Sequence, residues 1–370
     1  MKVLITGVNG FVGKNLQLHL AERKDVQVVC FTRGDDVAQL PALLQGVDFV
    51  FHLAGVNRPK DTAEFAEGNT GLTEQLCDLI RASGRAIPVL YTSSIQAVAD
   101  NPYGVSKLAA EEALVALEKD THSPVYLYRL PNVFGKWSRP NYNSAVATFC
   151  HNIANDLPIQ INDPATPVSL VYIDDVIDDF MRLLDERPAG VIRPEVSPVY
   201  TITVGDLASQ IRAFKSGRES MVTEAVGTGL TRALYATYLS FMRPEQFSYT
   251  LTAHAHADAR GRFVEMLKTK DSGQFSYFTA HPGITRGGHY HHTKNEKFLV
   301  IQGKARFGFR HIITAETYEL FTDGEKPQVV ETVPGWSHDI TNVGENEMIV
   351  MLWANEIFDR LRPDTITYKV

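Results

Sequence analysis

The sequence contains few cysteines, no long apolar run and no block of basic residues. Its three cysteines, Cys30, Cys77 and Cys150, lack CxxC spacing, which argues against a thiolate metal site and against a disulfide framework. No apolar run is long enough to cross a bilayer, and residues 2–7 are typical of a core strand and not of a secretory signal, so we expect a cytoplasmic protein. A net charge of -7 without clustered Lys or Arg argues against nucleic acid or an anionic membrane as a partner.

The distribution of apolar residues divides the 370-residue chain into two parts. Up to about residue 184, short apolar runs alternate with helical patterns, which predicts an α/β Rossmann-type fold with a doubly wound parallel sheet. After about residue 247, short β-prone segments are separated by Gly, Pro and Asn turns, which is typical of an all-β sandwich or barrel. We therefore expect two domains, residues 1–246 and residues 247–370.

A glycine-rich turn follows the first expected strand. Its glycines stand three residues apart, a spacing that lets the backbone turn tightly and approach a pyrophosphate at the N-terminus of the next helix. A glycine triplet alone is a weak signal, but here it has the strand-turn-helix context that the motif requires. We expect a dinucleotide to bind at Gly7, Asn9, Gly10, Phe11, Val12 and Gly13.

The end of the second expected strand bears on which dinucleotide binds. An arginine there pairs with the 2′-phosphate of NADP, whereas an acidic residue binds the ribose of NAD. Arg33 stands at this place and favours NADPH. The nearby Asp35 and Asp36 keep NAD open.

Tyr103 and Lys107 lie four residues apart on one face of an expected helix. A cation beside a phenol lowers the phenol pKa, so this tyrosine can exchange a proton with a carbonyl oxygen while a hydride moves to the adjacent carbon. Ser94, after the expected strand at residues 89–92, can hydrogen-bond to the same oxygen. Such a Tyr-Lys pair alone is more often a surface feature. Together with the glycine turn and Ser94, it predicts a reductase whose catalytic residues are Ser94, Tyr103 and Lys107.

These motifs resemble those of the extended short-chain dehydrogenase/reductases that modify sugar nucleotides. The resemblance covers most of residues 1–180 and rests on Gly7-x-x-Gly10-x-x-Gly13, His52-Leu53-Ala54-Gly55, Asn69-Thr70-Gly71, Thr92-Ser93-Ser94, Tyr103-x-x-x-Lys107, Arg129-Leu130-Pro131-Asn132-Val133-Phe134-Gly135 and Val171-Tyr172-Ile173-Asp174-Asp175-Val176. It implies that the cofactor is also bound by Tyr103, Lys107, Leu53, Ala54, Gly55, Arg129 and Asn132. It further implies that a nucleotide sugar is held by Asn57, Arg58, Asn132 and Asn141.

A second group of motifs lies in the C-terminal part. His289, His291, Glu296, Gly303 and His338 match both sequence motifs of the cupin barrels. Histidines two apart on a strand face the same side, and Glu296 with a third histidine from a neighbouring strand can close a shell around a divalent ion, zinc being the expected one. Four protein ligands are typical of a closed structural site, so it stays open whether the metal stiffens the barrel or takes part in chemistry.

Two segments resemble the nucleotide-sugar 3,5-epimerases: residues 258–265, which precede the metal-ligand motif, and residues 286–290, which lead into it. That resemblance implies that Arg260 binds the phosphates of the substrate and that His289 is the base of the epimerisation. A histidine that coordinates a metal cannot freely take a proton, so either the metal is adventitious or another group is the base. His292 and Lys297 are the candidates, and the alternative for each is a solvated neighbour of the metal strand.

Over its whole length the chain resembles the CapF family of bifunctional capsular-polysaccharide enzymes, with further matches at residues 57–59, 137–144 and 291–297. The resemblance implies a homodimer that acts on a UDP-linked amino sugar on the route to UDP-N-acetyl-L-fucosamine. The cupin epimerises C3 of a UDP-2-acetamido-2,6-dideoxy-4-hexulose in that family, and the N-terminal domain reduces the C4 ketone with NADPH. Two alternatives stay open: a reductase whose cupin only dimerises the chain, and a non-enzymatic protein that senses NADP.

Overall fold

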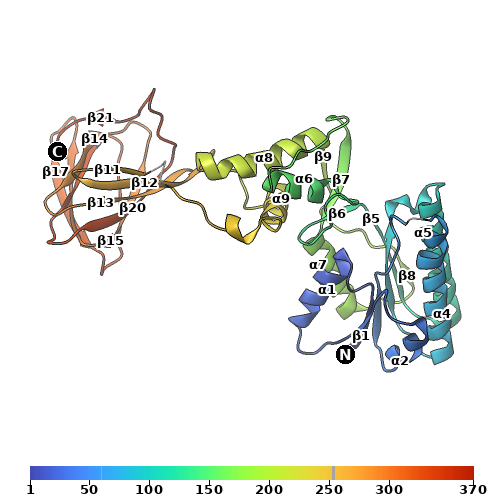
Figure 1. Ribbon diagram of the computed structural model, residues 1–370. Helices are drawn as coiled ribbons and strands as arrows, with labels where there is room; N and C mark the ends of the chain where they lie inside the picture. Colours follow the sequence, from blue (N-terminus) through green and yellow to red (C-terminus); the bar gives the residue numbers. More distant parts are fainter. Residues whose placement is uncertain (60, 252–254) are drawn as a thin grey trace. The chain divides into compact units, whose positions relative to one another are not determined.

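The computed structural model describes residues 1–59, 61–251 and 255–370 (Figure 1). By their contacts these residues form two compact units, Met1–Ser209 with Ala236–Phe241, and Gln210–Tyr235 with Met242–Val370. Helices α8 (Val204–Ser220) and α9 (Gly229–Leu239) each contribute residues to both units. The boundary near residue 246 remains a prediction about which segments fold independently. No helix in the described part of the chain is both long and apolar enough to cross a membrane.

The first unit is built on a parallel sheet, which confirms the Rossmann-like fold expected from the alternating pattern. Neighbouring strands are parallel throughout the order β2-β1-β3-β4-β5-β8. Because β2 and β3 flank β1 on opposite sides, the carboxyl ends of β1 and β3 form a topological switch point, where ligands bind in such sheets. The strands are β1 (Lys2–Thr6), β2 (Gln27–Phe31), β3 (Phe49–His52), β4 (Val89–Ser94), β5 (Val125–Leu130) and β8 (Val191–Ile192).

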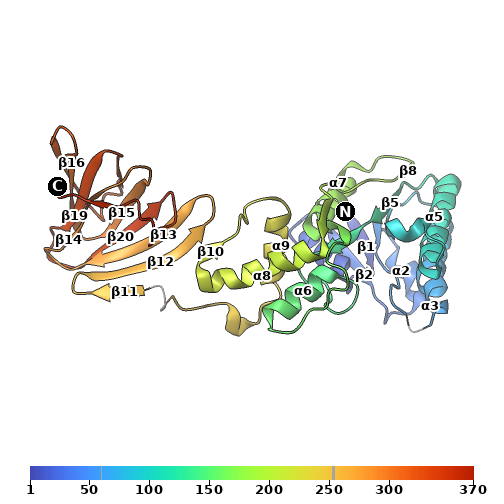
Figure 2. The ribbon, with the colours of Figure 1, turned by 90° about the horizontal axis from the view of Figure 1, so that it is seen from above.

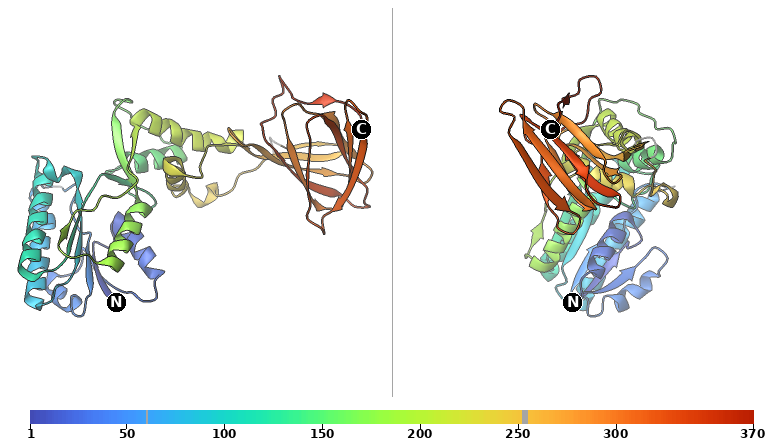
Figure 3. Two further views of the ribbon diagram at one scale, coloured as in Figure 1. Left: turned by 180° about the vertical axis from the view of Figure 1, so that it is seen from behind. Right: turned by 90° about the vertical axis from the view of Figure 1, so that its left-hand side faces the viewer.

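Helices cover both faces of this sheet, with α4 and α5 on one face and α1 and α7 on the other (Figures 1 and 3). Between the sheet and the first pair, Leu4, Val50 and Leu114 belong to one buried apolar cluster. On the other face, the ring of Phe180 in α7 packs 4.8 Å from that of Tyr128 in β5. The helices are α1 (Phe11–Ala21), α2 (Leu40–Leu43), α3 (Ala63–Phe65), α4 (Leu72–Ser83), α5 (Pro102–Thr121), α6 (Ala145–Ala154) and α7 (Ile173–Glu186).

Three strands of this unit form a separate small sheet in the order β6-β7-β9. They are β6 (Asn132–Phe134), β7 (Pro167–Tyr172) and β9 (Tyr200–Thr203). The alternating pattern up to residue 184 predicts one parallel sheet, but β7 lies in this small sheet and not in the main one, because it pairs with β6 and β9. Short helical turns complete the unit and the chain after it: η1 (Val37–Gln39), the π-helical η2 (Ala66–Gly71), η3 (Ile95–Val98) and η4 (Pro244–Gln246).

The second unit has two mainly antiparallel sheets, as the all-β pattern predicts. One has the order β10-β12-β13-β20-β15-β18, with β11 beside β12 (Figure 2), and the other has the order β17-β16-β19-β14-β21. Apolar side chains from both sheets, such as Phe298 and Phe307, form one buried cluster, so the core lies between the sheets. The strands are β10 (Val222–Thr223), β11 (Ala255–Asp258), β12 (Gly261–Thr269), β13 (Gly273–Ala280), β14 (Thr285–Tyr290), β15 (Glu296–Gln302), β16 (Lys304–His311), β17 (Thr317–Asp323), β18 (Val329–Glu331), β19 (Trp336–Asn342), β20 (Met348–Ala354) and β21 (Ile366–Thr367).

Candidate functional site

The glycine turn joins β1 to α1 at the switch point of the parallel sheet. Gly7 has a φ of +74°, and a Cβ added to it would lie 2.7 Å from the Cα and N atoms of Ala54. A Cβ at Gly13 would lie 2.4 Å from the carbonyl oxygen of Gly7. Glycine therefore allows the turn to pack against the end of β3 and α1 to pack against the turn. Gly10 caps α1 without a side-chain hydrogen bond, so the first N–H groups of the helix remain available to an anion.

A cavity of about 790 Å³ opens beside this turn and brings together the two motifs of the first unit. Ser94 at the end of β4 and Tyr103 and Lys107 near the start of α5 line it together with the glycine turn. The other predicted residues that line it are Asn9, Phe11, Val12, Leu53, Gly55, Asn57 and Asn132. The cavity can thus receive a dinucleotide along the turn and a second molecule beside Tyr103.

Burial dominates the electrostatics of the catalytic candidates. It raises the pKa of Tyr103, and a hydrogen bond with Ser94 opposes this shift. It lowers the pKa of Lys107 to about 8, which the carboxylate of Glu111 opposes. The Lys107 ammonium donates to the carbonyl oxygen of Thr92 at 2.9 Å. The sequence predicts a lowered pKa for Tyr103, whereas burial outweighs any stabilisation of the phenolate here and keeps the phenol protonated.

Arg129 does not line this cavity, although the sequence predicts a contact with the cofactor. Its Nη2 atom lies 2.7 Å from Oε2 of Glu111, and the hydroxyl of Ser93 donates to the same carboxylate at 2.5 Å. Glu111 is buried, so this ion pair joins α5 to β4 and β5. Glu111 stands one helical turn after Lys107, and that spacing is the signal by which the sequence could identify it as an inward-facing residue.

Besides Arg129, four predicted residues of the first unit lie outside the cavity or beside it. Arg33 is 89% exposed, with Nη2 3.4 Å from the carboxylate of Glu64. The backbone of Ala54 packs against Gly7 instead of facing the cavity. Two of the residues predicted to bind substrate line a neighbouring cavity of about 570 Å³ that shares residues 142–144 with the first: Arg58 and Asn141.

In the second unit, the structure brings together the four residues predicted to bind a metal. His289 lies in β14, Glu296 in β15 and His338 in β19, while His291 follows β14 directly. One ligand atom from each lies within 4.8 Å of the ligand atoms of the others. The ring centroid of His289 is 4.9 Å from that of His291 and 4.7 Å from that of His338. The donor set is three imidazoles and one carboxylate, as in many zinc sites.

The hydrogen bonds around this cluster fit a divalent cation. Nδ1 of His291 contacts the carbonyl oxygen of Asp364, which only accepts hydrogen bonds, so Nδ1 carries the proton. Nε2 of His291 then faces Oε2 of Glu296 at 3.2 Å. Both ring nitrogens of His338 are buried without a hydrogen-bond partner among the described residues, and its Nε2 lies 3.3 Å from the same oxygen. A cation between these atoms would satisfy all three side chains.

Burial raises the pKa of Glu296, but its contacts with His291, His338 and Lys294 outweigh this effect and hold that pKa well below the usual value. Burial lowers the pKa of His289 to about 4, so its ring is neutral at neutral pH. The carboxylate and the neutral imidazole are the protonation states that a metal ion requires of its ligands.

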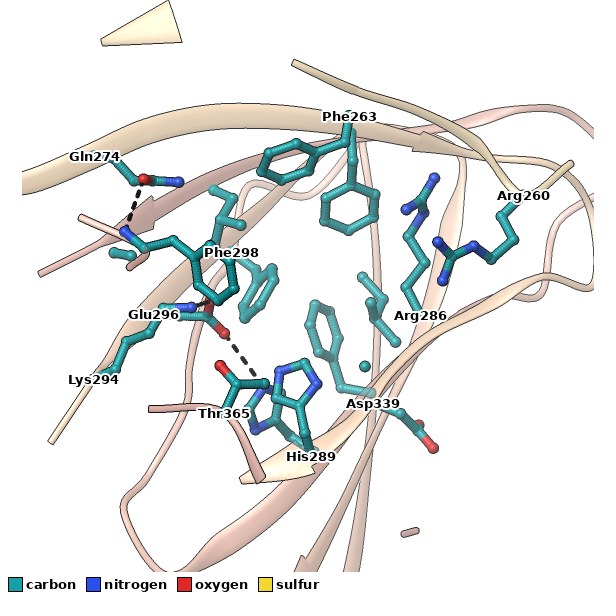
Figure 4. A pocket seen from close by; sticks show the side chains of 18 of the residues that line it. Arg260, Phe263, Gln274, Arg286, His289, Lys294, Glu296, Phe298, Asp339 and Thr365 are labelled. Carbon is teal, nitrogen blue, oxygen red and sulfur yellow. Dashed lines mark hydrogen bonds and ion pairs between the residues drawn. The ribbon is translucent and has the colours of Figure 1, made fainter. Parts of the chain in front are cut away.

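The cluster lines a cavity of about 460 Å³ in the second unit (Figure 4). Figure 4 shows Arg260 and Arg286 next to each other, across the cavity from Glu296 and Lys294. Arg260 is ion-paired with Asp258 at 2.6 Å, whereas Arg286 donates from Nε to the carbonyl oxygen of Thr279 at 3.1 Å. The phenylalanines that line the cavity are Phe263, Phe278, Phe298, Phe307 and Phe358. The cavity therefore has a cationic side, an apolar middle and a metal-ligand side.

His292 and Lys297 do not line this cavity. Lys297 pairs with Glu331, with Nζ 2.8 Å from Oε1, and its side chain is half exposed. Side chains two residues apart share a face of a strand, so Lys297 lies on the opposite face of β15 from Glu296. Lys294 stands two residues before Glu296 and lines the cavity, with Nζ 2.8 Å from Oε1 of Glu296. Lys294 precedes β15, so no strand period marks it, and only the structure shows its place in the cavity.

Comparison with protein families assigns a match to each part of the chain. Residues 3–196 match the NAD dependent epimerase/dehydratase family, and residues 256–366 match the polysaccharide biosynthesis C-terminal domain. A protein of Pseudomonas aeruginosa named UDP-2-acetamido-2,6-beta-L-arabino-hexul-4-ose reductase is 62% identical over 370 residues, which cover 100% of this chain and 99% of that protein.

Solved structures show the same organisation. The crystal structure of the capsular polysaccharide assembling protein CapF from Staphylococcus aureus matches with a TM-score of 0.92 and 40% identity, covering 100% of both chains. A crystal structure of CapF with the inhibitor 3-isopropenyl-tropolone matches with a TM-score of 0.87 and 36% identity, again over 100% of both chains.

Proposed function

The chain belongs to the NAD dependent epimerase/dehydratase family and is a CapF-like protein with a polysaccharide biosynthesis C-terminal domain, and we propose that it is a bifunctional enzyme acting on a UDP-linked amino sugar. In this proposal the second unit epimerises C3 of a UDP-2-acetamido-2,6-dideoxy-4-hexulose, and the first unit reduces the C4 ketone. The observation that carries the proposal is the meeting of Ser94, Tyr103, Lys107 and the glycine turn in one cavity.

The reduction requires a hydride at C4 and a proton at the ketone oxygen. A bound nicotinamide cofactor supplies the hydride. Ser94 and Tyr103 hydrogen-bond to the ketone oxygen, and Tyr103 donates its proton as that oxygen becomes an alkoxide. The raised pKa of Tyr103 supports this direction, because it keeps the phenol protonated before the transfer. Lys107, in its charged form, binds the cofactor and stabilises the phenolate that remains.

The cofactor of this proposal is NADPH. Arg33 stands at the end of β2, the place where a 2′-phosphate is recognised in such folds. Its guanidinium is 89% exposed, and its contact with Glu64 is 3.4 Å long. Exposed ion pairs of this kind contribute little free energy, so Arg33 can turn to a phosphate at small cost.

The second unit is, in this proposal, a cupin barrel whose His289, His291, Glu296 and His338 hold zinc. An ion held by these four residues would link β14, β15 and β19 and so stabilise the metal-ligand side of the cavity. We propose this structural role because four protein ligands leave no open position for a substrate oxygen.

The remaining groups of this cavity suit a nucleotide sugar with a C4 ketone. Arg260 and Arg286 on the cationic side receive the phosphates of UDP. Inversion requires that a base take the C3 proton and that a proton return to the opposite face of C3. The intermediate between the two transfers carries negative charge on the C4 oxygen, and the ammonium of Lys294 can stabilise that charge from the side of the cavity opposite the arginines. Lys294 suits this cationic role better than Lys297, because Lys294 lines the cavity and Lys297 does not. Each of the two lysines is paired with a carboxylate at 2.8 Å.

The two reactions have a required order. The C3 proton is acidic only while C4 is a ketone, so epimerisation precedes reduction, and reduction then fixes the new stereocentre. The product in this proposal is a UDP-linked sugar of the 6-deoxy-L-talose type, which serves the synthesis of UDP-N-acetyl-L-fucosamine and of surface polysaccharide. We propose a homodimer as the working form.

Incubation of the protein with the UDP-4-hexulose in deuterated water, with and without NADPH, tests this function by NMR of the products. Without NADPH we expect deuterium at C3, and with NADPH we expect one C3-inverted C4 alcohol. Reduction without any exchange at C3 would favour the alternative in which the second unit only joins two chains. Absence of both reactions would contradict an enzymatic role.

A further inference from the structure

The last strand of the chain is tied to the strand that carries the first metal ligand. In β21, Thr367 pairs with His289 and Ile366 pairs with Tyr290 of β14. The backbone N–H of Tyr368 donates to the carbonyl oxygen of Gly288 at 2.9 Å. The segment that precedes β21 therefore has a fixed position beside the turn that links β14 to β15.

Asp364 lies in that segment, and its side chain accepts hydrogen bonds from the turn. Its carboxylate accepts the backbone N–H groups of His292 at 2.9 Å, Thr293 at 2.7 Å and Lys294 at 2.9 Å. It also accepts the hydroxyl of Thr293 at 3.2 Å. Burial raises the pKa of Asp364, but these backbone hydrogen bonds outweigh it and lower that pKa strongly. Three consecutive N–H groups that converge on one anion leave the turn little freedom.

The main chain of the same residue fixes the ring of His291. The carbonyl oxygen of Asp364 contacts Nδ1 of His291, which leaves Nε2 directed toward Glu296. A hydrogen bond of this kind from the second ring nitrogen orients a metal-binding histidine and selects its tautomer. The carboxylate of Asp364 holds the turn after His291, and the carbonyl of Asp364 holds the ring itself.

We propose that Asp364 is a positioning residue of the second unit, which locks residues 292–294 and presents Nε2 of His291 to the metal ion. The inference rests on the metal site proposed above and adds to it a residue outside the ligand set. Lys294 depends on the same anchor, because its backbone N–H is one of the three donors. The anchor thus sets the places of His291 and Lys294 together.

The test uses full-length Asp364→Asn protein and Asp359→Asn as a matched control. Asparagine keeps the size of Asp364 but removes its charge and replaces one of the two accepting oxygens with an NH2 group, which cannot accept an N–H. Asp359 belongs to the same C-terminal segment, and its carboxylate accepts only the N–H of Leu361 among the hydrogen bonds that the structure records for it. Zn²⁺ affinity is measured by competition with a chromophoric chelator, and amide exchange of residues 290–296 is measured by mass spectrometry on the metal-free proteins.

Asp364→Asn should weaken Zn²⁺ binding about 10- to 100-fold, the usual effect of losing a group that orients a ligand. Its amides at residues 292–294 should exchange faster, and Asp359→Asn should match the wild type in both measurements. Equal Zn²⁺ affinity in Asp364→Asn and wild type would overturn the inference while leaving the metal site standing. Failure of the wild type to bind Zn²⁺ would contradict the metal site itself and the inference with it.

Discussion

Nε2 of His338 lies 3.3 Å from Oε2 of Glu296, and both side chains are buried. Without a cation, the ring nitrogens of His338 have no hydrogen-bond partner among the described residues. His338→Ala should therefore lose the bound metal and lower the melting temperature of the second unit by about 3 °C or more, which corresponds to roughly 1 kcal/mol in a domain of this size. Metal analysis and calorimetry measure the two effects.

The control for this variant is His281→Ala, a histidine of the same unit that lies 3.7 Å from Glu347 and is half exposed. It should keep both the metal and the melting temperature. Reduction of an already epimerised substrate should largely survive in His338→Ala. A metal-free protein that keeps its melting temperature but loses exchange at C3 would show that the ion is catalytic and not structural.

Tyr103→Phe removes the proton donor without altering the glycine turn. Reduction should fall about 100-fold or more, the usual contribution of a positioned general acid. The affinity for NADPH, measured by fluorescence titration, should change little, because the turn and Arg33 are intact. Near-normal turnover in this variant would contradict the role of Tyr103.

Arg33→Ala should distinguish the two nicotinamide cofactors. Its guanidinium is exposed at the end of β2 and is the cation proposed to pair with the 2′-phosphate. The apparent KM for NADPH should rise about 10-fold or more, since charge-assisted hydrogen bonds to a phosphate are strong. The apparent KM for NADH serves as the internal control and should stay nearly constant; equal increases for both would reject the role.

Lys107 predicts a pH dependence, because burial lowers its pKa to about 8. The side chain is charged below that pH and neutral above it. If the charged form binds the cofactor, kcat/KM for NADPH falls as the pH rises through about 8, since this parameter reports the groups of the free enzyme. A profile that is level from pH 7 to pH 9 would show that the charge of Lys107 is not required.

The local features of this protein are readable from its sequence. The glycine turn, strands β1 to β5 of the parallel sheet and the helix that bears Tyr103 are each set by a pattern of a few residues. The four metal-ligand candidates are also readable, because their spacing matches both sequence motifs of the cupin barrels. These predictions succeed because each feature depends on residues that are close together in the sequence.

Prediction from the sequence fails where the partner of a residue is distant in the chain, or where a residue is assigned to the wrong face of a strand. Lys297 is adjacent to Glu296 in sequence but on the other face of β15, where it pairs with Glu331. Arg129 forms an ion pair with Glu111, and no local pattern around Arg129 reveals that partner. Asp364 meets residues 292–294 across 70 to 72 positions of the chain, so only the folded structure shows the contact.

Epimerisation and reduction are proposed to occur at two separate sites, and C3 exchange in the Tyr103→Phe protein distinguishes this arrangement from a single shared site. The full-length variant is incubated with the UDP-4-hexulose in deuterated water without NADPH, next to a blank without protein and a Lys294→Met protein. We predict that Tyr103→Phe incorporates deuterium at C3 at close to the wild-type rate, while Lys294→Met is slowed and still reduces an epimerised substrate. Loss of exchange in Tyr103→Phe, with exchange retained in Lys294→Met, would place epimerisation in the first unit and contradict the two-site arrangement.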